Sequence, residues 1–393
     1  MLLQMEDIRV FHAPKIIIFG YCALYAFVVI LHPKKMMKTI SLFLSLLVLT
    51  PMAGHSQDTD TARVTNRTSD RFHGEIYMEA NHGFKHDEPV KNVWDFPHVV
   101  FSAEADLGGG WSVATELEYE RFHEDGRWNN VFRDNFTINQ LYVGKSISKE
   151  WQLKLGIQPL PIGAVNRGAE AMTIYDAASE AAIVPMTWHE AAVGLSWQHD
   201  DWLCQVIVPF IADLPLKRSH LFGLVGRVDY EGLLPGLQLG VSGFCGSANY
   251  GMLQDAAPED VVCLDGMAIA ALDWQYEDGG WLASGSAILS SEQKARTVGC
   301  ELGYDVMQLF TPLCSFRPFV RFDGIYANIT ANQYTVGAQF LPFSGVSTQK
   351  GKSLLLKFLS PLCFKAQWAV RRLCGSRTLH RWDIGVGYTV EIP

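Results

Sequence analysis

The sequence predicts an all-β protein, a transmembrane antiparallel β-barrel of about sixteen strands. Three observations lead to this prediction. Short segments alternate apolar with polar or small residues, many segments carry Trp or Tyr near their ends, and the connections between them alternate in length. An outer-membrane barrel has all three features, because its outer face meets lipid, its inner face meets water, and the turns at one end are short.

The segment Trp111–Arg121 shows the alternation clearly. Its aromatic and aliphatic residues fall on one face of an extended chain, and Glu116, Glu118 and Glu120 fall on the other, because successive side chains of a strand point to opposite sides. Three carboxylates on one face are too polar for a protein core, so we expect them to line a water-filled lumen. A soluble antiparallel sandwich also alternates and is the alternative.

The same pattern recurs along the chain, beginning near Phe72–Ala80. The further segments that alternate in this way are Trp151–Gln158, Glu190–Gln198, Met267–Tyr276, Thr297–Asp305, Phe316–Tyr326 and Trp382–Glu391. The polar residues that we expect to face the lumen from these strands are Lys154, Glu190, Glu301, Arg321 and Asp323. Arg321 and Asp323 are two residues apart, so they share a face and can form a lumen ion pair or one that only stiffens the wall.

The connections alternate long and short. The longer ones are Asn81–His98, Phe122–Asp134, Pro159–Thr187, Leu214–His220 and Gly246–Gly266. The shorter ones are Gly108–Gly110, Lys145–Glu150, His199–Asp201, Gly232–Gly236 and Glu277–Gly280. We therefore expect the longer set to be external and the shorter set, with both termini, to be periplasmic. This alternation of long and short connections is less regular after Val306.

The third long connection, Pro159–Thr187, is the longest, and a loop of this length usually has a function. It is rich in Gly and Ala, which allow close packing against a wall. We predict that this external loop folds into the lumen. We expect Arg167 to lie near the narrowest point, facing Glu116 and Glu118, with Glu170 beside it.

The N-terminus contains two apolar runs, Ile16–Leu31 and Ile40–Leu49. The second follows lysines and ends in small residues, as a secretory signal does. A signal should not follow another apolar run, so Met36 or Met37 is the expected start. The alternative is a membrane helix at Ile16–Leu31. The expected division is 1–35 over-extended N-terminus, 36–56 signal peptide, 57–71 periplasmic lead-in and 72–393 outer-membrane barrel.

Composition excludes several classes of protein. A net charge of −9 argues against nucleic-acid binding. The eight cysteines show no metal-site spacing, so we expect no metal and no cofactor. A disulfide between Cys245 and Cys263 stays an open possibility.

His189 and Glu190 are neighbours on a strand, so their side chains point to opposite faces and cannot easily form a catalytic or metal-binding pair. No GxSxG motif is present, and we expect no enzyme.

Several motifs resemble one family. They are Phe101–Trp111 (FSAEADLGGGW), Gln140–Val143 (QLYV), Pro161–Gly163 (PIG), Ile183–Pro185 (IVP) and Thr187–Glu190 (TWHE). Together they resemble the phosphate-selective porin O and P family, over most of Phe72–Pro393. The resemblance implies a barrel of about sixteen strands, usually trimeric, with the third external loop in the lumen.

The chain departs from that family in two respects. Its named members select phosphate with a ladder of arginines and a ring of lysines. Here the arginines at expected inward positions are Arg167, Arg227, Arg317 and Arg321, and the five expected lumen glutamates oppose them. The last strand ends in Val390–Pro393 instead of Phe.

The expected function is that of a porin in the outer membrane of a Gram-negative cell, exported through a cleaved signal peptide. Small hydrophilic solutes, ions or anions would diffuse passively through the loop-constricted barrel. The expected partners are the lipid bilayer and two further copies in a homotrimer, with no nucleic acid. The alternative is a non-conducting barrel that acts as a surface scaffold or binding protein.

Overall fold

The computed structural model describes residues 71–86, 88, 90–128, 136–168, 171–175, 177–185, 188–212, 220–249, 267–291, 294–311, 313–327, 330–344, 359–373 and 377–392. The chain divides into two units, Met1–Val64 and Thr65–Pro393, and every described residue belongs to the second. The expected signal peptide at 36–56, the segment 1–35 and nearly all of the lead-in at 57–71 lie outside the described residues. Glu170 and Cys263 lie outside them as well.

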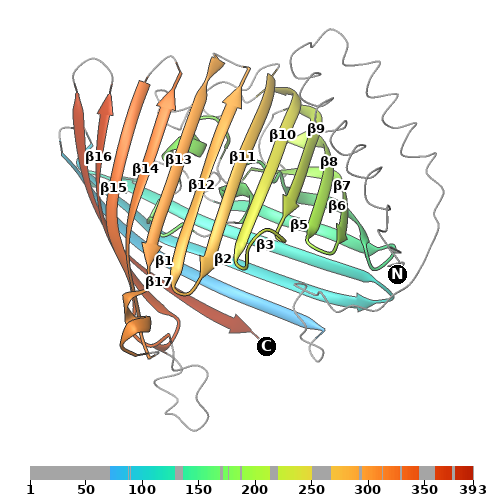
Figure 1. Ribbon diagram of the computed structural model, residues 1–393, viewed down its shortest axis with the longest axis horizontal. Coiled ribbons are helices and arrows are strands. Elements are labelled where there is room, and N and C mark those ends of the chain that lie inside the picture. The colour runs from blue at the N-terminus through green and yellow to red at the C-terminus, as the bar shows by residue number, and fades with distance from the viewer. Residues whose placement is uncertain are drawn as a thin grey trace, which may run out of the picture. The chain divides into compact units, whose positions relative to one another are not determined.

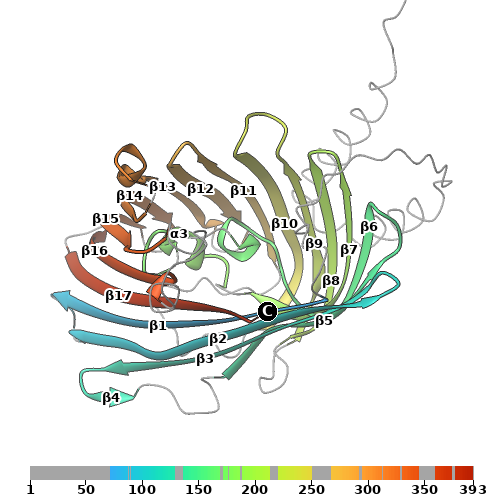
Figure 2. The same ribbon diagram turned by 90° about the horizontal axis from the view of Figure 1, so that it is seen from below.

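Sixteen strands of the described residues form a closed antiparallel ring (Figures 1 and 2). They are β1 (Phe72–His86), β2 (Asn92–Gly108), β3 (Trp111–Glu124), β5 (Phe136–Ser146), β6 (Trp151–Pro159), β7 (His189–His199), β8 (Trp202–Ala212), β9 (His220–Tyr230), β10 (Leu237–Asn249), β11 (Met267–Asp278), β12 (Trp281–Ser290), β13 (Arg296–Tyr304), β14 (Ser315–Tyr326), β15 (Thr330–Leu341), β16 (Leu362–Leu373) and β17 (Thr378–Ile392). A seventeenth described piece, β4 (Arg127–Trp128), pairs with the end of β3. Because β1 pairs with both β2 and β17, the ring has no free edge. The predicted fold class is confirmed.

The two faces of the ring differ in chemistry, as the alternation predicts. On β13, buried and exposed residues alternate strictly along the strand: Glu301 is buried, whereas its neighbours Cys300 and Leu302 are exposed. The same holds on β11, where Leu272 is 56% exposed and Asp273 is fully buried. The carboxylates Asp273 and Glu301 are therefore enclosed, and their neighbours Leu272 and Leu302 are turned outward.

One predicted connection is wrong. Asn81–His98 is not a long loop, because β1 continues to His86 and β2 begins at Asn92. The polar residues of this stretch face each other across the two strands: Asn81 Nδ2 donates to Asp95 Oδ2 at 3.0 Å. A polar inner face therefore resembles a loop in the sequence. Phe122–Asp134 is also shorter than predicted, since β3 runs to Glu124.

The ring strands alternate in direction, so successive connections lie at opposite rims. One rim, here called the turn rim, holds the tight turns at 109–110, 200–201 and 279–280 together with the start of β1 and the end of β17. The other, the loop rim, holds the connection 160–188, which is the longest between ring strands. After β13 the length rhythm reverses, because the turn-rim connections 305–314 and 342–361 exceed their loop-rim neighbours.

The described helices are three short pieces: η3 (Val165–Arg167), α3 (Ala178–Ala181) and η5 (Val306–Leu309). No helix in the described part of the chain is long and apolar enough to cross a membrane.

Candidate functional site

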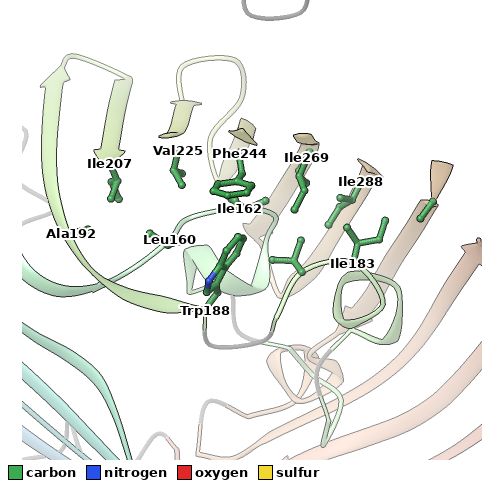
Figure 3. Packing of buried hydrophobic residues seen from close by; sticks show 13 residues of the cluster. Leu160, Ile162, Ile183, Trp188, Ala192, Ile207, Val225, Phe244, Ile269 and Ile288 are labelled. Carbon is green, nitrogen blue, oxygen red and sulfur yellow. The ribbon is translucent and has the colours of Figure 1, made fainter. Parts of the chain in front are cut away.

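The segment 160–188, here called the inner segment, begins and ends against the enclosed face of β8 to β12. Its residues Leu160, Ile162, Ile183 and Trp188 belong to one apolar cluster that also holds five large strand residues (Figure 3). Those strand residues are Ile207, Val225, Phe244, Ile269 and Ile288. The rings of Trp188 and Phe244 meet at 5.2 Å between centroids. Burial of these side chains fixes both ends of the inner segment.

The middle of the inner segment is held by polar groups of β13 to β16. Ser179 donates to Asp323 Oδ1 twice, from its backbone nitrogen at 3.1 Å and from Oγ at 2.7 Å. The backbone nitrogen of Met172 donates to Glu301 Oε1 at 2.9 Å, and that of Ile174 donates to Gln367 Oε1 at 2.9 Å. Figure 2 shows α3 within the ring. The inner segment thus contacts the enclosed face from β8 to β16.

The inner segment is also tied to itself through Glu180, which is 2% exposed. The Glu180 carboxylate accepts hydrogen bonds from the backbone nitrogens of Ala164 at 3.3 Å and Val165 at 3.0 Å. Burial raises the pKa of the Glu180 carboxyl. Gly163 has a φ of +77°, and a Cβ there would lie 2.5 Å from Glu180 Oε2, so this close approach requires glycine.

Arg227 on β9 is the centre of a buried charge cluster. Its side chain is fully buried and donates to Asp229 Oδ1 at 2.6 Å and to Asp273 Oδ1 at 2.7 Å. It also donates to the backbone oxygen of Gly163 at 3.3 Å. One guanidinium therefore joins two strands and the inner segment. We call Arg227, Asp229 and Asp273 the Arg227 cluster.

Arg167 lies beside the Arg227 cluster. Its guanidinium is 3.8 Å from Asp229 and 3.6 Å from Asp273, and it donates to Gln275 at 2.9 Å. Its predicted partners, Glu116 and Glu118 on β3, are not its contacts. The apolar ends of the inner segment pack on β8 to β12, which brings Arg167 to β9 and β11.

Three other predicted residues come together on β13 and β14. Arg321 Nε donates to Asp323 Oδ2 at 2.9 Å, and Arg321 Nη1 lies 3.5 Å from Glu301 Oε2. Because Asp323 and Glu301 also accept from the inner segment, this ion pair anchors that segment as well as joining two strands.

The remaining predicted residues lie on β3, β6 and β7. Glu116 and Glu118 accept from Asn139 Nδ2 at 3.1 and 2.7 Å. Glu120 lies 3.7 Å from His98 Nδ1. Lys154 Nζ lies 4.6 Å from the centre of the Tyr142 ring. Glu190, 2% exposed, accepts from Trp188 Nε1 at 3.1 Å, so it holds the end of the inner segment.

Sequence reasoning placed Arg227 at an inward position but missed its partners Asp229 and Asp273, as well as His98 and Ser179. Arg227 and Asp229 form the same two-residue spacing as Arg321 and Asp323, and that signal could have identified the Arg227 cluster. His98 could not have been found in this way, because its stretch resembles a connection. Ser179 carries no signal in an Ala-rich segment.

No family model matches this chain, and no curated protein matches it. Solved structures of outer-membrane proteins do. A loop L8 deletion mutant of OmpT from Vibrio cholerae has a TM-score of 0.54 at 10% identity, covering 81% of this chain and 99% of that one. OmpF of Salmonella typhi, in complex with daunomycin, has a TM-score of 0.55 at 9% identity, covering 81% and 97%. At these identities the likeness shows the fold alone, a closed barrel of the outer-membrane porin type.

Proposed function

We propose that this chain is a porin of the Gram-negative outer membrane, through which small hydrophilic solutes or ions diffuse passively. The observation that carries the proposal is the inner segment, fastened by hydrogen bonds to charged side chains on the enclosed face of the ring. A polar, enclosed face and an apolar outer face suit a barrel that holds water inside and lipid outside. A segment within such a lumen narrows it.

We propose further that the loop rim is external, so that the inner segment is the third external loop. Support comes from the tight turns, which lie at the same rim as the start of β1 and the end of β17. In bacterial barrels of this kind the short turns are periplasmic. The N-terminal residues 36–56 would then be the export signal. N-terminal sequencing of the outer-membrane form should begin near Gln57.

The charges of the wall favour cations over anions. The inner segment covers β8 to β16, so the passage would be bounded on its other side by β1 to β3. That side carries Glu79, Glu116, Glu118 and Glu120 close to one another, with His98 among them. Fixed carboxylates in a narrow aqueous passage raise the local concentration of cations. We therefore propose that the resemblance to the phosphate-selective family extends to architecture and not to phosphate as the solute.

A homotrimer is also proposed, on the resemblance and on one solved match, OmpT of Vibrio cholerae in its trimer form, with a TM-score of 0.52 at 9% identity. Light scattering of the detergent-solubilised barrel should give three times the mass of one chain.

Liposome swelling tests the proposal of a diffusion pore. Purified barrel in liposomes should admit small sugars and exclude large ones, so swelling rates should fall with solute size. A chain with Ser179→Ala and Asp323→Asn, which loses one anchor of the inner segment, should admit larger solutes. Swelling no faster than that of protein-free liposomes, with folded barrel present, would favour the scaffold alternative.

A further inference from the structure

One imidazole and four carboxylates lie close together on the enclosed face of β1 to β3. Three of these groups form one row across the strands, and the other two lie beside that row. Glu79 on β1, His98 on β2 and Glu120 on β3 lie directly opposite one another in the sheet register. Glu118 is two residues from Glu120 on the same face. The fifth group, Asp95, lies three residues before His98 and would point away from it in a regular strand.

A β-bulge brings Asp95 to the same side as His98. Asp95 pairs with Asn81 and His98 pairs with Glu79, so the two residues between Asp95 and His98 oppose only one residue of β1. The register with β3 shifts at the same place. A bulge of this kind redirects a side chain, and here it sets both side chains on the enclosed face.

The two nitrogens of His98 have different surroundings. Nε2 donates to Glu118 Oε1 at 2.9 Å, which leaves Nδ1 of a neutral imidazole with its lone pair. Nδ1 lies 3.5 Å from Asp95 Oδ2 and 3.7 Å from Glu120 Oε1. Glu79 Oε2 lies 4.0 Å from the same nitrogen. Nδ1 is buried and makes no hydrogen bond to any residue that the structure describes.

Asp95 supplies an independent observation. Its side chain is 4% exposed, and its Oδ1 is buried without a hydrogen-bond partner in the described part of the chain. Its other oxygen accepts from Asn81. A buried carboxylate oxygen with no partner is costly, and three carboxylates around one lone pair repel one another unless a cation lies between them.

We propose that Asp95, His98 and Glu120 bind a divalent transition-metal ion of the Zn²⁺ class on the barrel wall, with Glu79 beside it as a fourth ligand. The ligand atoms of these three residues lie within 4.8 Å of one another. Two ligands of a tetrahedral zinc ion, each about 2.0–2.1 Å from it, are roughly 3.4 Å apart, close to the separations around Nδ1. A mixed set of imidazole and carboxylates favours zinc over calcium or magnesium.

Glu118 would be a positioning residue for His98, whose Nε2 lies 2.9 Å from its carboxylate. A carboxylate that accepts the second ring N–H of a metal-bound histidine orients the ring and increases its basicity. The site is independent of whether the barrel conducts, since it requires only the folded wall of β1 to β3. The competing arrangement is a protonated His98 that is paired with the carboxylates and binds no metal.

Zinc titration of the full chain tests the inference. The folded barrel, purified in detergent and stripped with a chelator, is titrated with ZnCl₂ in a calorimeter. One ion per chain should bind. His98→Gln and Asp95→Asn should each weaken binding by about 100-fold, and Glu118→Gln by about tenfold, because it keeps the ligands and loses only the orienting contact. Glu104→Gln removes a charge from the same face of β2 and should bind as the unmodified chain does.

Zinc X-ray absorption of the unmodified chain gives a second measurement that does not depend on variants that fold. It should show nitrogen and oxygen ligands at about 2.0–2.1 Å with the scattering of one imidazole. No zinc uptake, equal affinity in all variants that show the gel mobility of a folded barrel, a spectrum without imidazole, or a sulfur shell would each overturn the inference. The protonated-histidine arrangement predicts the first of these results.

Discussion

At the scale of single residues, the two arginines that share Asp229 and Asp273 differ in what they do. Arg227 is fully buried and makes hydrogen bonds of 2.6 to 3.0 Å to both carboxylates. Arg167 is 10% exposed and lies 3.6 and 3.8 Å from them. Arg227 is therefore placed to stabilise the fold, whereas we propose that Arg167 affects the charge at the edge of the inner segment.

We predict that Arg227→Gln strongly destabilises the barrel. Removing the guanidinium leaves two buried carboxylates without their main partner, which typically costs about 3–5 kcal/mol. Urea unfolding in lipid vesicles measures the free energy of unfolding. The matched control is Arg167→Gln, which should cost clearly less, because the Arg167 guanidinium lies 3.8 and 3.6 Å from the two carboxylates and makes no hydrogen bond to them. Equal losses in the two variants would contradict the difference in role.

Residue pairs at a spacing of two could be predicted, because a strand repeats every two residues; Arg321 and Asp323 are the example, and their ion pair is present. Arg167's partners could not be predicted. They depend on which part of the ring the inner segment packs against, and the apolar cluster of Leu160 and Ile162 with β8 to β12 decides that. Contacts between distant segments leave no periodic signal.

At the scale of elements, the inner segment contains a titratable carboxyl group, Glu180, which joins two parts of the segment by hydrogen bonds. Burial raises the pKa of Glu180, so the folded barrel binds this proton more tightly than the unfolded chain does. The contribution of the protonated form to stability is present at acid pH. It is lost as the pH rises from the ordinary carboxyl pKa through the raised one.

We therefore predict that the inner segment is held more firmly below the ordinary carboxyl pKa than at alkaline pH. Single-channel recordings should show less open-channel current noise at the lower pH. Glu180→Gln, which mimics the protonated carboxyl, should remove this dependence, and Glu104→Gln should retain it. Persistence of the full pH effect in Glu180→Gln would assign it to another group.

Strand positions were predictable where the outer face is strongly apolar, as in Trp111–Arg121 and Thr297–Asp305. The ends of β1 and β2 were not, because both faces there are rich in polar residues. His82 on the outer face packs on Trp94, with ring centroids 4.2 Å apart. A polar residue at a rim can lie in a strand as readily as in a loop.

At the scale of the whole molecule, the number of strands followed from the rhythm of the connections, and the closed ring confirms it. The rhythm failed after β13, where the connections 305–314 and 342–361 lie at the turn rim. Length alone therefore does not assign a connection to a rim. The antiparallel order of the strands does.

The two rims should differ in accessibility on whole cells. In a chain whose native cysteines are replaced, Arg127→Cys at the loop rim should react with an impermeant maleimide. Leu233→Cys, which is at the turn rim and replaces a side chain that is 59% exposed, should react only after the outer membrane is permeabilised. The opposite pattern would invert the orientation.

The most direct test of the central claim is the reversal potential of single channels under a KCl gradient in a planar bilayer. An ion current with a preference for cations is expected, set by the carboxylates of β1 to β3. Arg167→Gln should increase that preference, because it removes a positive charge beside Asp229 and Asp273. A folded barrel without current, or equal reversal potentials for Arg167→Gln and the unmodified chain, would contradict the account.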